Sequence, residues 1–230
     1  MKKKYTTLYK YVPRTYLNDI LKNERLYLDD GKKFNDPFEI GVVDRKTNEI
    51  NHLEGLHILS LTNSFQNKLM WSHYAENHMS VCLTIRVPNE YVYPICYTKH
   101  RVFDDTNIDE IIEKRKKFYK KSVEKEFSNL TREKKIALVK DQKWIYEKEY
   151  RLVFDVYDET NLIYDNDKWF IPVKITNVYL GVKFDKNDKV FITEILNICK
   201  EKNIKVTNMI LSNENYSVVV KHKFNKKKGE

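Results

Sequence analysis

The spacing of apolar residues along the chain predicts a series of short strands interrupted by helices. Alternating patterns, or runs of β-branched and aromatic residues, mark the segments expected to be strands. These segments are 5–12, 25–29, 57–62, 79–87, 91–97, 149–157, 169–174, 176–182, 205–211 and 217–224. Apolar residues three or four positions apart predict helices at 14–23, 67–77 and 188–202.

The section 108–146 is rich in lysine and glutamate and contains two further helical patterns. The second pattern runs from Leu130 to Trp144, with Ser128 or Asn129 as its N-cap. Runs of strands separated by helices indicate an α+β fold with mixed or antiparallel sheets and short flanking helices. We expect one such domain over residues 1–225, with a charged helical insertion at about 106–146, and a polar tail at 226–230.

Composition restricts the environment and the class of partner. The 42 basic and 33 acidic side chains give a net charge of +9, which favours nucleic acid as a partner. No apolar run is long enough to span a membrane, and the N-terminus lacks the pattern of a signal peptide. Three scattered cysteines suit reduced thiols. We therefore expect a cytoplasmic protein that contacts no membrane.

A metal site is not expected from the spacing of histidines and cysteines. His73, His78 and Cys82 would spread over a helix and the strand that follows it, where they more simply pack or face solvent.

The most distinctive chemistry lies at the start of the strand predicted at 149–157. If side chains alternate along this segment, Glu147, Glu149 and Arg151 share one face, and apolar side chains occupy the other. One interpretation places the two carboxylates and the guanidinium at a strand end where chemistry can use them. The alternative is a solvated edge, on which Arg151 neutralises its neighbours in an ordinary ion pair.

Four short strings together resemble a bacterial family known only as a domain of unknown function, DUF2971. They are Leu8-Tyr9-Lys10-Tyr11, Phe34-Asn35-Asp36-Pro37-Phe38-Glu39, Met70-Trp71-Ser72-His73-Tyr74-Ala75 and Trp144-x-x-Glu147-x-Glu149-x-Arg151. The resemblance covers most of residues 5–182, and it implies no activity.

The order of elements is also similar to that of the ADP-ribosyltransferase superfamily. Its arginine-specific members have a basic residue on the first strand, a Ser-Thr-Ser-like strand, and a Glu-x-Glu that supplies the catalytic acid. Lys10, Ser60-Leu61-Thr62 and Glu147-Lys148-Glu149 stand at these places. The chain departs from the pattern because its first strand has no arginine and Ser-Leu-Thr matches only in part. This resemblance implies NAD as a substrate, and an ADP-ribosyltransferase or NAD glycohydrolase acting as a toxin or phage-defence effector.

Cleavage between nicotinamide and ribose passes through an oxocarbenium-like centre, which a carboxylate stabilises. We assign that role to Glu149, which lies deeper in the strand, and assign to Glu147 the orientation or deprotonation of the acceptor. The other side chains expected around NAD are Tyr9, Lys10, Tyr11, Arg14, Ser60, Thr62, Trp71, Tyr74 and Arg151. Stacking on a ring is the expected role of Tyr9 and Tyr11, for which core packing is the alternative.

Two further sets of residues, His73 and the loop from Asn35 to Glu39, have more than one interpretation. His73 is a candidate proton carrier, or else a hydrogen-bonded histidine without catalytic duty. Asn35, Asp36 and Glu39 form a candidate substrate loop. With Glu147 and Glu149 they would offer the hard oxygen ligands of a magnesium-dependent nuclease, although we favour a simple turn closed by Asn35 and Asp36 and anchored by Phe38. A nucleic-acid-binding module and a non-catalytic interaction protein therefore remain alternatives, and the partner is nucleic acid or a protein acceptor.

Overall fold

A computed structural model describes residues 5–31, 34–102, 105–116, 127–155, 158 and 161–221. The chain divides into two compact units. Unit 1 comprises residues 1–8, 24–63 and 86–174, and unit 2 comprises residues 9–23, 64–85 and 175–230. The predicted tail at 226–230 lies outside the described residues. The prediction of one domain over residues 1–225 stays a prediction.

Unit 2 is built on strands with the order β15-β14-β13-β6-β1. These are β15 (Val218–Val220), β14 (Lys205–Leu211), β13 (Lys174–Leu180), β6 (Val81–Pro88) and β1 (Tyr5–Val12), of which β1, β6 and β13 contribute residues to both units. β14 pairs in parallel with β13 and antiparallel with β15, so the pairing is mixed. The helices of the unit are α1 (Arg14–Asn23), α2 (Lys68–Tyr74) and α5 (Lys189–Glu201).

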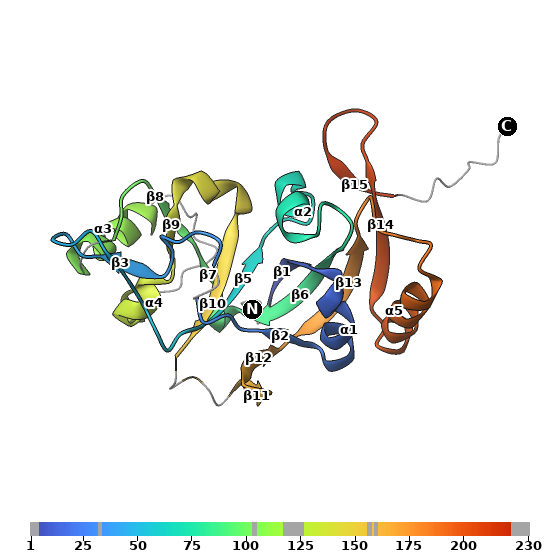
Figure 1. Ribbon diagram of the computed structural model, residues 1–230, viewed down its shortest axis with the longest axis horizontal. Coiled ribbons are helices and arrows are strands. Elements are labelled where there is room, and N and C mark those ends of the chain that lie inside the picture. The colour runs from blue at the N-terminus through green and yellow to red at the C-terminus, as the bar shows by residue number, and fades with distance from the viewer. Residues whose placement is uncertain are drawn as a thin grey trace. The chain divides into compact units, whose positions relative to one another are not determined.

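Helices α1 and α5 lie side by side in unit 2 (Figure 1). Asn18 and Lys22 of α1 both donate to the carboxylate of Glu194 on α5, each at 2.7 Å. The first turn of α5 is capped by Asp188, whose side chain accepts from the Phe191 amide at 3.0 Å. A cap of this kind satisfies one of the amides that a helix start leaves without a partner.

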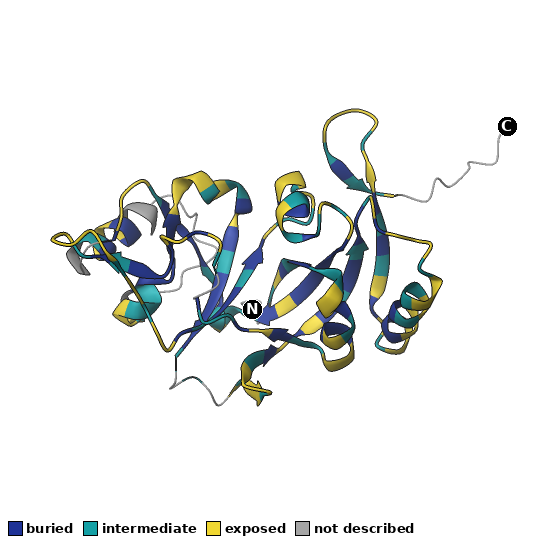
Figure 2. Cartoon of the chain, in the orientation of Figure 1, coloured by how far each residue is buried: buried dark blue, intermediate teal, exposed yellow. Residues whose placement is uncertain are grey.

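Unit 1 is organised around β10 (Glu149–Phe154), which lies antiparallel between β5 (His57–Thr62) and β7 (Tyr93–Pro94). Figure 2 shows that β10 is buried along most of its length. Three smaller sheets complete the strands of the unit. They are β11 (Ile163–Asp165) with β12 (Lys168–Pro172) and β2 (Arg25–Tyr27), β3 (Gly41–Val43) with β4 (Ile50–His52), and β8 (Cys96–Thr98) in parallel with β9 (Val139–Asp141).

The helices of unit 1 are short. α3 (Asp105–Lys116) and α4 (Arg132–Ile136) are α-helical, and η1 (Asn89–Tyr91), η2 (Phe127–Asn129) and η3 (Gln142–Glu147) are 3₁₀ turns. Ile108, Ile111 and Ile112 of α3 pack into a hydrophobic core with Ile136, Leu138 and Val153. Helix α3 thus packs against α4 and β8.

The α+β class with mixed pairing is confirmed, and several elements lie where the sequence predicts them. β1, β5, β14 and α1 have the predicted bounds, and α2 and α5 differ by a few residues at their ends. None of the helices in the described ranges combines the length and the apolar character needed to cross a membrane.

The prediction of a second long helix between Leu130 and Trp144 is wrong. The helix α4 ends at Ile136, and the chain continues as strand β9 and the 3₁₀ turn η3. The N-cap is Thr131, whose hydroxyl accepts from the Lys134 amide, and neither Ser128 nor Asn129. Residues 117–126 of the predicted insertion lie outside the described ranges.

Gly181 packs against a strained segment of unit 2. Three consecutive residues, Glu76, Asn77 and His78, have positive φ angles of 50°, 54° and 71°. A Cβ at Gly181 would lie 2.2 Å from the carbonyl oxygen of His78. That oxygen also accepts from the Lys183 amide at 3.1 Å, so the backbone on both sides is fixed.

We predict that Gly181→Ala lowers the free energy of unfolding by about 3 kcal/mol or more, because the new methyl group has no room. Gly55 is the matched control. Its φ is +74° but nothing lies within 4 Å of a Cβ built there, so Gly55→Ala should cost only the conformational term of about 1–2 kcal/mol. Urea unfolding followed by circular dichroism measures both losses, and equal losses would contradict the steric explanation.

Candidate functional site

Five buried charged side chains form one ion network in unit 1. The ammonium nitrogen of Lys140 lies 2.9 Å from Glu39 Oε1, 2.6 Å from Glu147 Oε2 and 3.0 Å from Glu149 Oε2. The guanidinium of Arg151 donates from Nε to Glu149 Oε1 at 2.7 Å and from Nη2 to Glu39 Oε2. Every member of the network is at most 5 % exposed. Three carboxylates therefore face two cations in a place that water hardly reaches.

Local backbone structure explains how Glu147 and Glu149 reach the same cations. Lys148, between them, has a left-handed conformation with φ 47° and closes the turn η3, so Glu147 precedes the strand and Glu149 begins it. Glu149 and Arg151 then share one face of β10 by ordinary strand alternation. The prediction that Glu147 continues this strand face is wrong, since the left-handed turn, and not alternation, directs it inward.

Arg151 hydrogen-bonds to its own strand β10, to the turn before β3 and to the end of α4. Its Nη1 donates to the carbonyl oxygen of Ala137 at 2.7 Å, just before the strand that carries Lys140. Its guanidinium carbon lies 4.9 Å from the centre of the Phe34 ring. The interpretation of this region as a solvated edge is wrong, because Arg151 is 0 % exposed. The ion pair that this interpretation expected is present, but it is buried.

Glu149 and Lys140 keep their charges against the cost of burial. Burial alone would raise the pKa of the Glu149 carboxyl, but Arg151 and then Lys140 outweigh it and lower this pKa to about 2. Burial likewise favours neutral Lys140, yet Glu149, followed by Glu39 and Glu147, more than compensates, and the lysine pKa is raised. Glu149 therefore stays an anion at neutral pH, and Lys140 stays a cation.

The turn before β3 aims Glu39 into the network. Asp36 closes this turn: its Oδ1 accepts from the Phe38 amide at 2.9 Å, and its backbone oxygen accepts from the Glu39 amide at 3.1 Å. Its Oδ2 accepts from the indole of Trp144 at 2.7 Å. The turn predicted at Asn35-Asp36-Pro37 is confirmed, and Asp36 in addition fixes η3 through Trp144.

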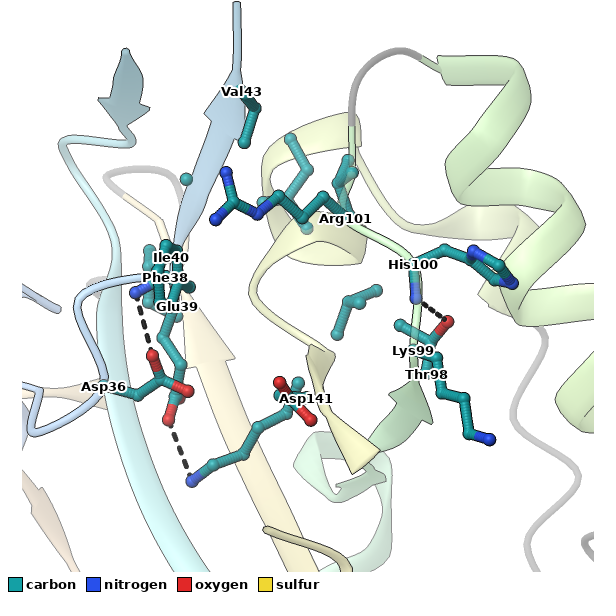
Figure 3. A pocket seen from close by; sticks show the side chains of 15 residues that line it. Asp36, Phe38, Glu39, Ile40, Val43, Thr98, Lys99, His100, Arg101 and Asp141 are labelled. Carbon is teal, nitrogen blue, oxygen red and sulfur yellow. Dashed lines mark hydrogen bonds and ion pairs between the residues drawn. The ribbon is translucent and has the colours of Figure 1, made fainter. Parts of the chain in front are cut away.

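A cavity of about 150 Å³ opens beside this network. Asp36, Glu39, Lys140 and Asp141 line it together with the loop Lys99-His100-Arg101 and apolar residues such as Ile136 and Val139. Figure 3 shows Arg101 reaching across toward the side formed by Phe38 and Ile40, whereas Lys99 and His100 point away from the cavity. The Arg101 guanidinium carbon lies 4.4 Å from the centre of the Phe38 ring.

The cavity wall and the network behind it carry an excess of negative charge. Three acidic residues (Asp36, Glu39, Asp141) and three basic residues (Lys99, Arg101, Lys140) are among the lining. Behind them, Glu147 and Glu149 add two negative charges and Arg151 adds one positive charge. The net charge of these residues is −1, and Arg101 lies near Phe38.

Ser60 and Thr62 lie beside the two glutamates on the neighbouring strand. In the antiparallel register of β5 and β10, Thr62 is opposite Glu149 and Ser60 is opposite Arg151. The Thr62 hydroxyl donates to the Glu147 carbonyl oxygen at 2.6 Å. A hydrogen bond from Ser60 contributes to the lowered pKa of Glu149. The structure therefore brings together the predicted residues of these two segments.

The predicted aromatic residues Tyr9, Tyr11 and Trp71 belong to unit 2. Tyr11 is buried, packs edge-on against Trp71 at 5.1 Å between ring centres, and donates to the Ser64 carbonyl oxygen at 3.0 Å. Tyr9 lies 5.2 Å from the ring of Phe65. These contacts are those of core packing, and a ligand-binding role of Tyr9, Tyr11 and Trp71 stays a prediction.

The other predicted residues of unit 2 have distinct positions. His73 is exposed on α2 and contacts the ring of Tyr74 edge-on at 6.3 Å. Lys10 is half-buried on β1. Arg14 forms an ion pair with Asp188, and its guanidinium carbon lies 4.0 Å from the centre of the Phe191 ring. The roles predicted for these side chains remain predictions.

The hydroxyl of Ser72 lies beside the ring of His78. Its oxygen lies 3.3 Å from His78 Nε2 and also donates to the Lys68 carbonyl oxygen at 3.1 Å. His78 is stacked on Trp71 at 6.1 Å, and burial followed by Lys183 lowers its pKa.

Sequence reasoning missed two residues of the site, Lys140 and Arg101. The sequence pattern predicts Lys140 within the charged helix, although the apolar run Ala137-Leu138-Val139 before it also fits a short buried strand. Arg101 carries no comparable signal. As for the magnesium ligands, Glu39, Glu147 and Glu149 do converge, but on the ammonium of Lys140. Within the described ranges, no group of three His, Cys, Asp or Glu side chains is arranged to hold a metal ion.

We predict that Glu149 makes stability depend on acid pH. Its folded pKa of about 2 lies below the ordinary value of 4.5, so its contribution is complete above pH 4.5 and is lost as the pH falls toward 2. The loss amounts to about 3 kcal/mol. Denaturant unfolding between pH 7 and pH 2.5 should show a flatter dependence for Glu149→Gln than for the native protein. Glu49→Gln, at an exposed position, should retain the native slope; identical slopes in all three proteins would contradict the assignment.

Comparison with known proteins gives one family match. Residues 70–152, a stretch of 83 residues in a chain of 230, match the model of a family described as "Protein of unknown function (DUF2971)". No curated protein and no solved structure matches the chain. The match includes the string Met70–Ala75 and the start of β10, and it supports the resemblance to this family of unknown function.

Proposed function

We propose that unit 1 binds NAD at the cavity beside the ion network and cleaves the bond between nicotinamide and ribose. The observation that carries this proposal is the distribution of charge around the cavity. Asp36, Glu39 and Asp141 contribute carboxylates to its lining, the lining and the network behind it together carry a net charge of −1, and Arg101 lies near Phe38. NAD has the complementary arrangement, with a cationic pyridinium ring at one end and an anionic pyrophosphate farther along.

The size of the cavity favours the nicotinamide end of NAD. Cavities that enclose a drug-sized ligand have volumes of roughly 300–1,000 Å³, and this one has about 150 Å³. It therefore suits one ring and its substituent, while the remainder of the dinucleotide extends over the surface. In this orientation the pyridinium faces the acidic wall and the pyrophosphate meets Arg101, which can donate two parallel hydrogen bonds.

The contact between β5 and β10 supports the resemblance to ADP-ribosyltransferases. That superfamily combines a Ser-Thr-Ser-like strand with Glu-x-Glu, and here Ser60 and Thr62 lie opposite Arg151 and Glu149 in the strand register. A glutamate carboxylate next to the ribose would stabilise the positive charge that develops at its anomeric carbon. The enzyme would then be an ADP-ribosyltransferase or an NAD glycohydrolase, depending on whether a protein, a nucleic acid or water accepts the ADP-ribose. Depletion of NAD would suit a toxin or a phage-defence effector.

The purified protein should release nicotinamide from NAD, as measured by liquid chromatography. Arg101→Ala should raise the dissociation constant for NAD about 10-fold or more, because a charge-assisted hydrogen bond to the pyrophosphate is lost. Arg101 is exposed, so the fold should be retained. Lys46→Ala is the control, since Lys46 is an exposed cation of the same unit outside the cavity lining.

Absence of nicotinamide release in the presence of protein, DNA and RNA acceptors would rule out the cleavage. Equal affinities of the native and Arg101→Ala proteins would rule out the proposed orientation.

A second candidate function is the binding of nucleic acid through the loop Lys99-His100-Arg101. The observation that favours it is that all three residues are exposed and that Lys99 and His100 point away from the cavity (Figure 3). Together with the net charge of +9, this loop suits contacts with phosphates.

Nucleic-acid binding predicts a salt-dependent affinity for a single-stranded oligonucleotide in fluorescence anisotropy. Each lost phosphate contact should reduce the slope of log K against log salt by about 0.7. Lys99→Ala combined with Arg101→Ala should therefore flatten the slope by roughly 1.4. The matched double variant, Lys46→Ala with Lys168→Ala, removes two exposed cations elsewhere in the unit. Equal slopes for the two double variants would exclude this loop as the contact surface.

A further inference from the structure

We infer that Glu39 presents the reacting carboxylate to the ligand, and that Glu149 positions Arg151 and Lys140 behind it. This inference rests on the proposed function and assigns the part of the ligand that Glu39 meets, a compact organic cation such as a pyridinium ring. Glu39 and Lys140 line the cavity, whereas Glu147, Glu149 and Arg151 do not.

Both oxygens of Glu149 are already occupied by donors. Oε1 accepts from Arg151 Nε at 2.7 Å, and Oε2 accepts from Lys140 at 3.0 Å and from Arg151 Nη2 at 3.2 Å. Each of these bonds lies within the network and none leads to the cavity. A ligand would have to displace a buried cation to reach Glu149, which would leave that cation without its partner.

In the part of the chain that the structure describes, Glu39, unlike Glu149, accepts hydrogen bonds on only one of its two carboxylate oxygens. Its Oε2 accepts from Arg151 Nη2, but within the described residues its buried Oε1 accepts no hydrogen bond. Oε1 is 2.9 Å from the Lys140 ammonium, whose hydrogen bonds go to Glu147 and Glu149. This oxygen is therefore ion-paired with Lys140, and a carboxylate oxygen has a second lone pair that another group can reach. The Glu39 side chain is 1 % exposed, and such an open position in a buried carboxylate points to a ligand.

The surrounding turn holds Glu39 in this position. Asp36 is fixed to Trp144 and to the backbone of Phe38, and Ile40, which follows Glu39, is locked in a left-handed conformation with φ 56°. A non-glycine residue in that conformation is strained and persists only where its surroundings require it. In Figure 3 the labelled side chains of Asp36 and Glu39 lie close together on one side of the cavity.

The chemistry of this arrangement is balanced without a further reactant when water is the acceptor. The bond between the anomeric carbon and the pyridinium nitrogen breaks, and its electron pair goes to the nitrogen, which becomes neutral nicotinamide. The Glu39 carboxylate stabilises the positive charge left on the ribose. Water then forms a bond to the anomeric carbon, and the proton it loses passes to Glu39 and from there to solvent. The products are nicotinamide, ADP-ribose and one proton.

The test compares a charged ring with a neutral one. The native protein should bind 1-methylnicotinamide, a pyridinium without phosphates, at least about 10-fold more tightly than neutral nicotinamide, because opposite charges attract in a poorly hydrated site. Isothermal titration calorimetry measures both affinities. Glu39→Gln should abolish the preference, and the exposed control Glu49→Gln should retain it. Equal affinities of the native protein for the two rings would overturn the inference, whatever the fate of any variant.

A second variant covers the case in which Glu39→Gln does not fold. Glu39→Asp keeps the charge for Arg151 but withdraws the carboxylate by one methylene group. It should lower kcat for NAD cleavage about 100-fold or more while KM changes less than about 3-fold. In Glu39→Asp, kcat and kcat/KM should fall by about the same factor relative to the control Glu49→Gln. An unchanged kcat would overturn the role of Glu39.

The outcomes separate the inference from the proposed function. A pyridinium preference that depends on Glu39, without release of nicotinamide from NAD, supports the cation site and contradicts NAD cleavage. Nicotinamide release without any pyridinium preference contradicts the role of Glu39 and leaves NAD cleavage standing.

Discussion

The burial of Arg151 constrains the rest of unit 1. A guanidinium without solvent contact loses several kcal/mol of hydration free energy. It stays buried in the folded protein only if charged and polar partners replace the lost water. Its partners are Glu149 on the same strand, Glu39 in the turn before β3, and the Ala137 carbonyl oxygen before β9. The turn at Glu39, the end of α4 at Ala137 and strand β10 must therefore meet at one point. A buried network of this kind is weak evidence for net stability, but loss of one partner is costly, so it specifies the arrangement of the segments.

The periodic spacing of apolar residues predicts those helices and strands whose apolar side chains face a core in a regular pattern. β1, β5, β14 and α1 fulfil this condition and have the predicted bounds. It failed for β9, because a strand of three residues with a buried lysine at its centre has no apolar alternation to detect. The pattern around Lys140 therefore predicts the polar face of a helix, because lysine is mostly exposed in proteins.

The candidate site was predictable in its residue types but not in its environment. Glu147, Glu149 and Arg151 were singled out correctly as a group, yet both interpretations left them in contact with solvent. Their burial depends on two partners, Glu39 and Lys140, whose distance from β10 along the chain no local pattern encodes. The left-handed Lys148 is also invisible to a pattern, since lysine seldom adopts that conformation and nothing in its neighbours requires it. Tertiary contacts, and not local preference, decide both features.

The same network gives its carboxylates unequal chemistry. Glu149 accepts three hydrogen bonds from two cations, and its pKa is lowered to about 2, so it is a fixed counter-ion that neither gains a proton nor meets another group at neutral pH. Glu39 shares both cations but keeps one oxygen without a hydrogen bond, at the wall of a cavity. Environments that separate neighbouring carboxylates in this way commonly divide their roles in catalysis. The acidic motif on β10 is then the support of the site, and the turn before β3, which looks like an ordinary loop in the sequence, presents the group that reacts.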